Sequence, residues 1–437
     1  MVQRIRWLFP LVVLMAWGLL WAAAPRPRVY VLRVEGIISP ATAIYIQRGI
    51  REAERAGAEA LVVELDTPGG LMTSMDQITK AILASPVPVI VYVSPPGARA
   101  GSAGVFILYA AHVAAMAPTT NVGAATPVFA GGGDQQETEN QRALQRKVTE
   151  DAVARIRTLA HRRGRNAEWG ERAVREAASI PAEEAVRLRV ADLLARDVRD
   201  LLNRVDGRWV EVRGERIALT TRGAELVALG MDLRERMLDL LADPNIGLIL
   251  LTIGVYGIIF ELNNPGAILP GIVGAIALVL GLTSLAILQV NYAGLALIGL
   301  AVLLFLADLF IPGHGILSVG GVISFILGAI LLTSNQEPYL RMSIELAVAI
   351  ALVSAAFFLF AVGAGLRAQR RRPTTGREAL LGAVGEARSE LTPQGVVFVQ
   401  GELWTAESVD GRIPEGSRVR VVEVEGLRLK VRKEGTA

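Results

Sequence analysis

Five long hydrophobic segments in the second half of the 437-residue chain most strongly limit what it can fold into. Each is close to the ~20 residues that an α-helix needs to cross a bilayer. Hydrophobic residues make up 52% of the sequence, and the excess lies in these runs. The sequence therefore predicts an all-α, multi-pass membrane region at 243–367. The segments lie at roughly 246–262, 267–288, 293–312, 315–334 and 344–366.

A further apolar run, Trp7–Ala24, follows Arg4 and Arg6 at the N-terminus. A basic start, an apolar run and a small-residue end are typical of a secretory signal peptide, with a cleavage site after Ala22–Ala24. The same pattern fits an uncleaved anchor helix, so both interpretations of residues 1–24 stay open. In either case the chain from about residue 26 is predicted to be exported.

The basic residues that flank the apolar runs predict the topology. Lys and Arg are enriched on the cytoplasmic side of membrane proteins. Arg4 and Arg6 favour a cytoplasmic start, and Arg367 with Arg370–Arg372 directly follows the last segment. An N-terminal helix and five further spans place both ends in the cytoplasm. Residues 26–242 are then extracytoplasmic, at the cell membrane.

The membrane region contains an internal repeat of 47 residues. This period equals two helices, so the two repeats are expected to share one orientation in the bilayer. A Pro-Gly break between helices indicates a turn or re-entrant elbow. The acidic residue before each break is either a functional intramembrane carboxylate or, the interpretation we favour, an interfacial group that caps or pairs locally. The repeated pairs are Glu261/Asp308, Pro265/Pro312, Gly266/Gly313 and Gly274/Gly321.

Residues 26–205 alternate short apolar strands with helical patterns, which predicts an α/β domain with a mainly parallel sheet. Residues 206–242 are predicted to be a linker with a small ribbon, Arg208–Leu219, and an amphipathic helix. The expected strands are Val29–Val34, Ala60–Leu65, Pro88–Val93 and Val113–Met116, and the expected helices are Ala43–Ala56, Met72–Ala84, Ser102–Ala111 and 141–163.

Residues 374–437 carry short valine-rich alternating runs, which predict a small all-β, OB-type barrel of five strands. Phe398 and Trp404 fit either stacking on nucleic acid or core packing, and core packing is favoured. Single-strand binding usually needs several basic and aromatic side chains that these strands lack. The net charge of +3 is also too small to indicate nucleic acid as a partner.

The absence of cysteine excludes a thiol nucleophile, thiolate metal ligands and disulfides. We expect no cofactor and no metal. The chain has three histidines, and none is well placed as a catalytic base. His112 is expected to face away from a site at the start of its helix, His161 lies among arginines, and His314 lies in the membrane region.

Two short motifs indicate a nucleophilic site. Asp66–Gly70 follows a strand, and its Pro-Gly-Gly sequence makes a tight turn with exposed backbone N–H groups. Ser102 begins a helix after the third strand, where the helix N-terminus stabilises negative charge. Ser102 is therefore either a nucleophile or a simple N-cap. Ala100 breaks the Gly-x-Ser-x-Gly pattern, which disfavours an α/β-hydrolase.

A serine nucleophile needs a general base. Lys147 lies in a predicted charged helix, where a lysine is most often a surface charge. A Ser–Lys dyad requires a neutral amine, so the lysine pKa must fall by several units from about 10.4. Burial beside an apolar wall supplies such a shift. Lys80, on the helix after the Pro-Gly-Gly turn, is a weaker candidate.

Six short motifs follow one another along the chain. They are Thr67-Pro68-Gly69-Gly70, Ala100–Gly104, Met116-Ala117-Pro118, Gly123–Val128, Gly164-Arg165-Asn166 and Val190–Leu193. In this order, and with Lys147 between the fourth and the fifth, they resemble the NfeD family of membrane serine proteases. That family belongs to the Clp protease/crotonase superfamily. The membrane repeats and the C-terminal barrel are similar as well, so the resemblance covers nearly the whole chain.

The resemblance implies a membrane-bound serine endopeptidase with Ser102 as nucleophile and Lys147 as base. It also implies that the backbone N–H groups of Gly70 and Ala103 form the oxyanion hole. The family commonly has Ala before the Ser-Ala-Gly sequence, whereas this chain has Gly101. That change leaves Ser102 in place.

The resemblance further implies cleavage of hydrophobic sequences, notably in stomatin-like membrane partners, and a homo-oligomer that is at least a dimer. We expect a substrate peptide to enter between the Gly69–Gly70 turn and the 121–136 loop, with Gly69 and Gly123 as substrate contacts. A non-catalytic scaffold that binds stomatin-like proteins is the alternative function. A crotonase-type acyl-CoA enzyme is disfavoured, because export removes the CoA supply.

Overall fold

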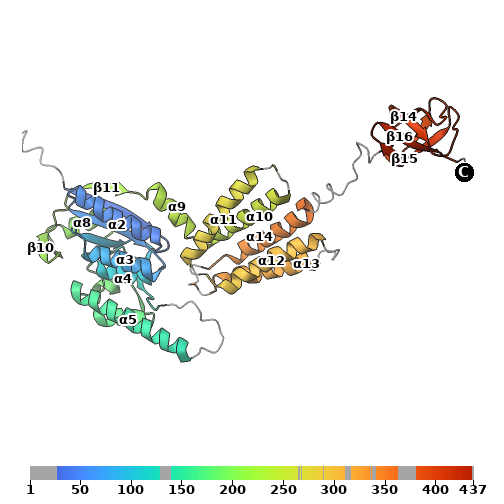
Figure 1. The fold of residues 1–437 in the computed structure, drawn as a ribbon. Helices are drawn as coiled ribbons and strands as arrows, with labels where there is room; N and C mark the ends of the chain where they lie inside the picture. The colour runs from blue at the N-terminus through green and yellow to red at the C-terminus, as the bar shows by residue number, and fades with distance from the viewer. Residues whose placement is uncertain are drawn as a thin grey trace, which may run out of the picture. The chain divides into compact units, whose positions relative to one another are not determined.

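The computed structural model describes residues 27–127, 139–263, 266, 268–288, 290–310, 316–334, 336, 341–362 and 380–435. The chain forms two compact units, Met1–Ala355 and Ala356–Ala437, shown in Figure 1. Several features of the sequence lie outside the described residues. They are the segment 1–24, the part of the 121–136 loop after residue 127, Pro265, Pro312, Gly313, His314, Arg367 and Arg370–Arg372.

The first unit contains the predicted parallel sheet. Its six strands lie in the order β11-β1-β2-β3-β5-β8, and every neighbouring pair is parallel. The α/β class is thus confirmed. The strands are β1 (Arg28–Glu35), β2 (Ala60–Asp66), β3 (Val89–Val93), β5 (Val113–Met116), β8 (Leu193–Leu194) and β11 (Glu225–Leu229).

Two apolar layers cover the sheet because successive strand side chains point to opposite faces. Val63 and Val91 belong to the larger core cluster, which includes residues of six helices. Val62 and Ile90, one position earlier, belong to a smaller cluster on the other face. The larger core includes residues of α2 (Pro40–Arg55), α3 (Met72–Leu83), α4 (Ala103–Ala110), α5 (Glu139–Arg163), α6 (Ala167–Arg175) and α7 (Ala182–Arg187). The smaller one includes residues of α8 (Val198–Val205) and of the ribbon β9 (Trp209–Val212) and β10 (Glu215–Ala218).

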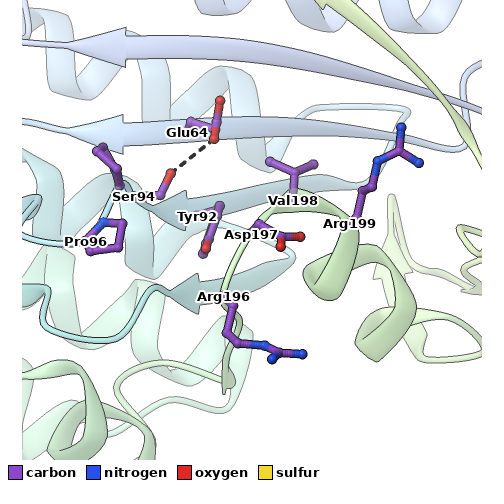
Figure 2. A pocket seen from close by; sticks show the side chains of 9 residues that line it. Glu64, Tyr92, Ser94, Pro96, Arg196, Asp197, Val198 and Arg199 are labelled. Carbon is purple, nitrogen blue, oxygen red and sulfur yellow. Dashed lines mark hydrogen bonds between the residues drawn. The ribbon is translucent and has the colours of Figure 1, made fainter.

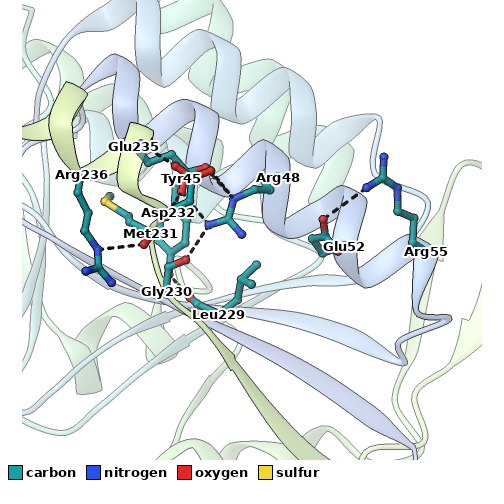
Figure 3. Close-up of polar contacts among 10 residues, drawn as sticks. All are labelled: Tyr45, Arg48, Glu52, Arg55, Leu229, Gly230, Met231, Asp232, Glu235 and Arg236. Atoms are coloured by element: carbon teal, nitrogen blue, oxygen red, sulfur yellow. Dashed lines mark hydrogen bonds and ion pairs between the residues drawn. The ribbon is translucent and has the colours of Figure 1, made fainter.

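Residues 206–242 hold the expected ribbon and helix, and they also complete the sheet. Strand β11 pairs with β1, so the sheet extends beyond residue 205, where the sequence pattern ended the domain. Helix α9 (Leu233–Leu241) then lies against α2. Arg48 of α2 donates to Glu235 of α9 at 2.7 Å and to the carbonyl oxygen of Gly230 at 2.7 Å (Figure 3).

The hydrophobic segments form helices close to the predicted bounds. Residues Pro244–Leu262 and Ile268–Leu288 are each long and apolar enough to cross a bilayer. The other three apolar helices are shorter over the part of the chain that the structure describes. The helices are α10 (Pro244–Asn263), α11 (Ile268–Leu288), α12 (Tyr292–Phe310), α13 (Ile316–Leu332) and α14 (Ile344–Ala356), and the π-helix η3 (Phe357–Val362) follows in sequence.

The 47-residue repeat is visible in three dimensions as two similar helix pairs, α10 with α11 and α12 with α13 (Figure 1). Glu261 accepts a hydrogen bond from the Gly271 N–H at 2.8 Å, in the first turn of α11. Asp308 accepts one from the Ser318 hydroxyl at 2.6 Å, in the first turn of α13. Since helix starts have free N–H donors, Glu261 acts as a local cap of α11, whereas Asp308 pairs locally with a side chain of α13.

Small residues let the helices of each pair touch. An added Cβ at Gly281 would lie 2.8 Å from the Leu251 nitrogen. One at Gly328, 47 positions later, would lie 2.9 Å from the Ile298 nitrogen. The two pairs therefore cross at equivalent points.

The second unit contains the predicted five-stranded barrel, closed in the order β12-β13-β14-β16-β15. Trp404 packs against its core, so the core interpretation is confirmed there. The same interpretation is wrong for Phe398, which is 37% exposed. Val397 and Val399 point inward, so the residue between them faces out. The strands are β12 (Val384–Ala387), β13 (Gln394–Val399), β14 (Glu402–Ser408), β15 (Arg418–Glu425) and β16 (Arg428–Lys433).

Candidate active site

A second, three-stranded sheet holds the loop that carries Ser102. Strand β4 (Arg99–Gly101) pairs with β6 (Asn121–Gly123), which pairs with β7 (Ser179–Pro181). The Ser102 N–H donates to the Gly123 carbonyl oxygen at 3.1 Å. Gly123 is thus beside Ser102.

The Pro-Gly-Gly turn lies on the other side of β4. The Thr67 N–H donates to the Arg99 carbonyl oxygen at 2.8 Å, and the Gly101 N–H donates to the Thr67 carbonyl oxygen at 2.9 Å. The two motifs that the sequence singled out are therefore adjacent in space. Ser102 follows directly after a strand that lies between the turn and Gly123.

The backbone of Ser102 has an unusual conformation, with φ 47° and ψ −110°. A positive φ in a residue other than glycine is costly, of order 1–3 kcal/mol, and such strain clusters at functional sites. Ser102 occupies the N-cap position of α4, yet its side chain makes no capping hydrogen bond. The simple N-cap interpretation is therefore wrong, and the hydroxyl is left for another role.

Two backbone amides near Ser102 are candidate oxyanion donors. Ala103 is the first residue of α4, so its N–H has no acceptor within the helix. Ile38 is hydrogen-bonded to both neighbours of Gly70, accepting from the Leu71 N–H at 2.9 Å and donating to the Gly69 carbonyl oxygen at 2.8 Å. Among the described residues, neither the Gly70 nor the Ala103 N–H has a backbone partner outside helices and strands.

Glycine is required at several of these positions because the chains approach closely. An added Cβ would lie 2.4 Å from the Ile38 carbonyl oxygen at Gly70 and 2.7 Å from the Pro68 carbonyl oxygen at Gly101. Gly123 has φ +150° and would clash with the Ala178 carbonyl oxygen at 2.3 Å. Glycine at position 101, where the family commonly has alanine, is therefore explained by the close approach of the Pro68 carbonyl oxygen in this chain.

Gly69 differs from Gly70 in its hydrogen bonding. Its N–H donates to the Thr67 hydroxyl oxygen at 3.0 Å. Its carbonyl oxygen accepts from the Ile38 N–H at 2.8 Å. Both main-chain groups of Gly69 are therefore occupied inside the turn, so a contact of this residue with a peptide would be steric.

Lys147 lies in a different environment. It is exposed on α5, and the first buried residues of that helix, among those whose burial is described, are Ala152 and Val153. The N-terminal end of α5 projects away from α4 (Figure 1). Among the described residues, no hydrogen bond joins Lys147 to Ser102. The part of the chain that the structure describes thus does not provide the burial that a neutral Lys147 requires.

The histidines that the structure describes do not replace Lys147. His112 is buried, and its Nδ1 accepts from the Val89 N–H at 3.1 Å. Burial, helped by the nearby Arg163, lowers the pKa of His112 to about 3. His161 and the weaker candidate Lys80 are exposed on their helices. The prediction that His112 faces away from the site is confirmed.

A buried ion pair between Arg165 and Asp192 supports α4, the helix that follows Ser102. Both residues lie in the sequence motifs, but the sequence assigned neither of them a role. Arg165 donates to the Tyr109 and Ala111 carbonyl oxygens, at 2.8 and 2.9 Å, where α4 ends. Arg165 also donates to Asp192 at 2.8 Å. Burial pushes the pKa of the Asp192 carboxyl up, but Arg165 and Arg208 outweigh it, so this pKa lies below its usual value.

A separate cleft of about 380 Å³ lies at the carboxyl end of β3 (Figure 2). Ser94 donates to Glu64 there at 3.3 Å, and the Tyr92 hydroxyl donates to the Ala195 carbonyl oxygen at 2.8 Å. Tyr92 belongs to the core cluster on the face of the sheet opposite to α4. The residues that line the cleft include none of the predicted site residues.

The fold and the site define a class: a membrane protein whose α/β domain holds a strained serine beside a glycine turn. Three family profiles match the chain. They are described as NfeD1b, N-terminal domain (residues 28–207), NfeD integral membrane domain (245–364) and NfeD-like C-terminal, partner-binding domain (377–433).

The chain is 37% identical over 419 residues to the membrane-bound protease PH1510 of Pyrococcus horikoshii, covering 93% of this chain and 94% of that protein. It is 27% identical over 442 residues to the membrane protein NfeD1b of Bacillus subtilis, covering 94% of each. The chain therefore belongs to the NfeD family. It is a homologue of a membrane-bound protease and has an integral membrane domain.

Among solved structures, the chain is similar to 1510-N, a membrane-bound stomatin-specific protease. A lysine-to-alanine variant of 1510-N in complex with a substrate peptide is 33% identical. The match covers 49% of this chain and 97% of that one, with a TM-score of 0.45. A serine-to-alanine variant is 35% identical and covers 47% and 99%, with a TM-score of 0.44.

Proposed function

We propose that this protein is a membrane-bound serine endopeptidase with Ser102 as nucleophile and Lys147 as general base. The observation that carries the proposal is the backbone of Ser102, which is strained and whose side chain caps nothing. A structural serine at a helix start would use its oxygen to cap. The kinship with a membrane-bound protease over nearly the whole chain supports the same activity.

In the proposed mechanism the neutral Lys147 amine takes the proton of Ser102 while Oγ attacks the scissile carbonyl carbon. The resulting oxyanion receives hydrogen bonds from the Gly70 and Ala103 amides, each worth about 3 kcal/mol in such sites. The protonated Lys147 then gives its proton to the leaving amine, and an acyl-enzyme remains. Water, deprotonated by Lys147, attacks this ester, and the second product leaves as the Lys147 proton returns to the Ser102 oxygen.

The exposure of Lys147 adds a condition to this mechanism. An amine in water keeps its proton near neutral pH, so Lys147 must be covered before it acts as a base. Either the bound peptide or a second copy of the chain supplies this cover. Of these two sources we propose the second: the active form is a homo-oligomer, at least a dimer, in which the exposed end of α5 is buried.

For the substrate we propose an apolar segment of a stomatin-like membrane protein. The peptide would lie between the Gly69–Gly70 turn and the chain that follows Gly123. The relative 1510-N is described as stomatin-specific, which supports this choice. We further propose an extracytoplasmic protease domain and a cytoplasmic barrel, on the basis of the flanking arginines.

The C-terminal barrel is proposed to bind the same partner, since its family profile is described as partner-binding. Phe398 and Leu403 form a cross-strand pair on β13 and β14. Both side chains are exposed, at 37% and 67%. Val396, two residues before Phe398 on β13, is also 37% exposed. Exposed apolar side chains that lie side by side in this way suit an apolar partner segment.

The test is cleavage of an apolar peptide from a stomatin-like protein by the full-length chain in detergent or lipid. Ser102→Ala and Lys147→Ala, made separately, should each abolish cleavage, and Lys80→Ala serves as the control that retains it. Unchanged cleavage by either of the first two variants would reject the dyad.

Labelling with a serine-reactive fluorophosphonate separates the peptidase from the non-catalytic scaffold. The proposed enzyme should be labelled, and Ser102→Ala should lose the label. A wild-type chain that binds a stomatin-like protein but takes up no label would favour the scaffold.

A further inference from the structure

Helix α9 connects the α/β domain to the first membrane helix. Only Ala242 and Asp243 separate its last residue, Leu241, from Pro244, where α10 begins. Residues Pro244–Leu262 of α10 are long and apolar enough to cross a bilayer. The polar interfacial zone of a membrane is several ångströms deep on each side. The end of α9 is therefore within reach of lipid headgroups by chain connectivity alone.

One face of α9 is fixed to the α/β domain by polar contacts. Glu235 is only 1% exposed and accepts from Arg48 of α2 at 2.8 and 2.7 Å (Figure 3). Asp239, one turn later, accepts from the Ser39 hydroxyl at 3.2 Å. Asp232 closes a capping box with Glu235 at the helix start. This face orients the helix firmly against α2.

The opposite face carries an unusual apolar stripe. Leu233, Met237 and Leu240 are 76%, 52% and 56% exposed. Their spacing of four and three residues places them one above another on a helix. Scattered exposed apolar residues are common, but a continuous stripe on a short helix marks a binding surface.

Two arginines border this stripe. Arg234 and Arg236 are both exposed, and at about 100° per residue they lie on either side of the line through Leu233 and Met237. Arginine side chains at such positions extend toward headgroups while their stems cover apolar surface. An apolar stripe between basic residues is the pattern of a helix that lies in the plane of a membrane interface.

We propose that α9 is an interfacial helix, with Leu233, Met237 and Leu240 inserted at the headgroup–acyl boundary of the bilayer that α10 enters. Arg234 and Arg236 contact anionic headgroups. Because Glu235 and Asp239 hold the other face of α9 to α2, the helix fixes the orientation of the whole α/β domain on the membrane surface. This inference concerns lipid contact and is independent of the proposed peptidase activity.

The chain has no cysteine, so a single introduced thiol can be labelled specifically. We suggest Met237→Cys carrying an environment-sensitive fluorophore in the full-length protein, in nanodiscs whose lipids have brominated acyl chains. The matched control is Trp209→Cys. Trp209 is also apolar and 67% exposed, but lies on the ribbon at the other face of the sheet. The label at position 237 should be quenched several-fold more by bromolipid, and less by aqueous iodide, than the label at 209.

Equal iodide quenching at the two positions would overturn the proposal. A second result would also overturn it: in discs that hold one copy, the label at position 237 is protected from iodide but is not quenched by bromolipid. Such a result would mean that protein, not lipid, covers the label. Protection that disappears in single-copy discs would assign the stripe to self-association and reject the lipid contact.

The arginines are tested with the same label. Raising the phosphatidylglycerol content should increase bromolipid quenching at position 237, and Arg234→Gln with Arg236→Gln should remove that increase. An increase that survives in the double variant would overturn the assigned headgroup contacts.

Discussion

Ser102 and Lys147, the two residues we propose for catalysis, lie in regions that are built in opposite ways. Ser102 follows a strand held on both sides by backbone hydrogen bonds, and glycines surround it because nothing larger fits. Lys147 lies on an exposed stretch of α5, before the first buried turn of that helix. The difference indicates that the oxyanion side is preformed in one chain, whereas the base side is completed by binding or association.

The largest expected effect comes from replacing the base without removing its charge. Lys147→Arg retains a long cationic side chain, but a guanidinium cannot give up its proton at any working pH. Peptide cleavage should fall by about 10²–10⁴-fold, the usual contribution of a general base. Thermal stability should change by less than about 0.5 kcal/mol, because Lys147 is exposed.

Cleavage and thermal unfolding, measured on the same preparation of Lys147→Arg, separate a loss of catalysis from a loss of stability. A large loss of stability in Lys147→Arg would show that the residue is already buried in the folded protein. Retained cleavage would show that a group other than Lys147 accepts the Ser102 proton.

The second-largest effect is expected in the proposed oxyanion hole beside Ser102. In Gly70→Ala the new Cβ would lie 2.4 Å from the Ile38 carbonyl oxygen, so the turn must move. Displacing one oxyanion donor costs about 10²–10³ in kcat, and we also expect lower stability. Gly230→Ala is the matched control, because its Cβ would meet nothing closer than 3.9 Å. Stopped-assay kinetics with chemical denaturation measure both quantities, and an unimpaired kcat in Gly70→Ala would remove this turn from the oxyanion hole.

The same contrast explains what could be predicted from the sequence. The sheet, the turn and the position of Ser102 follow from local patterns: alternating apolar residues, Pro-Gly-Gly after a strand, and small residues at a helix start. Strand β11 was not predicted, because it is only five residues long and its partner strand lies almost 200 positions earlier. The exposure of Lys147 could not be predicted either, since it depends on which surfaces associate.

The buried Asp192–Arg165 pair supports the Ser102 side, because Arg165 holds the carbonyl groups at the end of α4. Asp192→Asn removes the charge that compensates a 2%-exposed guanidinium. Loss of one partner of a buried pair costs about 3–5 kcal/mol, and the retained amide should keep the loss near the lower end. Urea unfolding measures this effect. A change below about 0.5 kcal/mol would mean that the pair contributes little to the fold.

The pH dependence of unfolding tests the same pair. The folded pKa of Asp192 lies below its usual value, so the carboxylate contributes stability that is fully present above the unfolded pKa of about 3.9. This contribution is lost as the pH falls through the folded pKa. The wild-type protein should lose its advantage over Asp192→Asn below about pH 4. A constant difference between the two proteins across this range would contradict the assignment.

The smallest expected effect lies on the Lys147 side. Arg155, two turns after Lys147 on α5, forms ion pairs with Asp76 of α3 and with Asp151 of its own helix. Of these two pairs of Arg155, the Asp76 pair joins α5 to another element, whereas the Asp151 pair lies within α5 and is mostly exposed. Partly exposed pairs contribute about 0–1 kcal/mol, so Asp76→Asn should hardly change the unfolding free energy. It should nevertheless lower cleavage by a few-fold, because α5 loses a tether near its free end and Lys147 is placed less reproducibly.

Asp151→Asn is the matched control and should leave cleavage unchanged. If both variants cleave at the wild-type rate, the position of Lys147 does not depend on this tether. The Glu150–Arg175 pair between α5 and α6, the second copy or the peptide then positions the base.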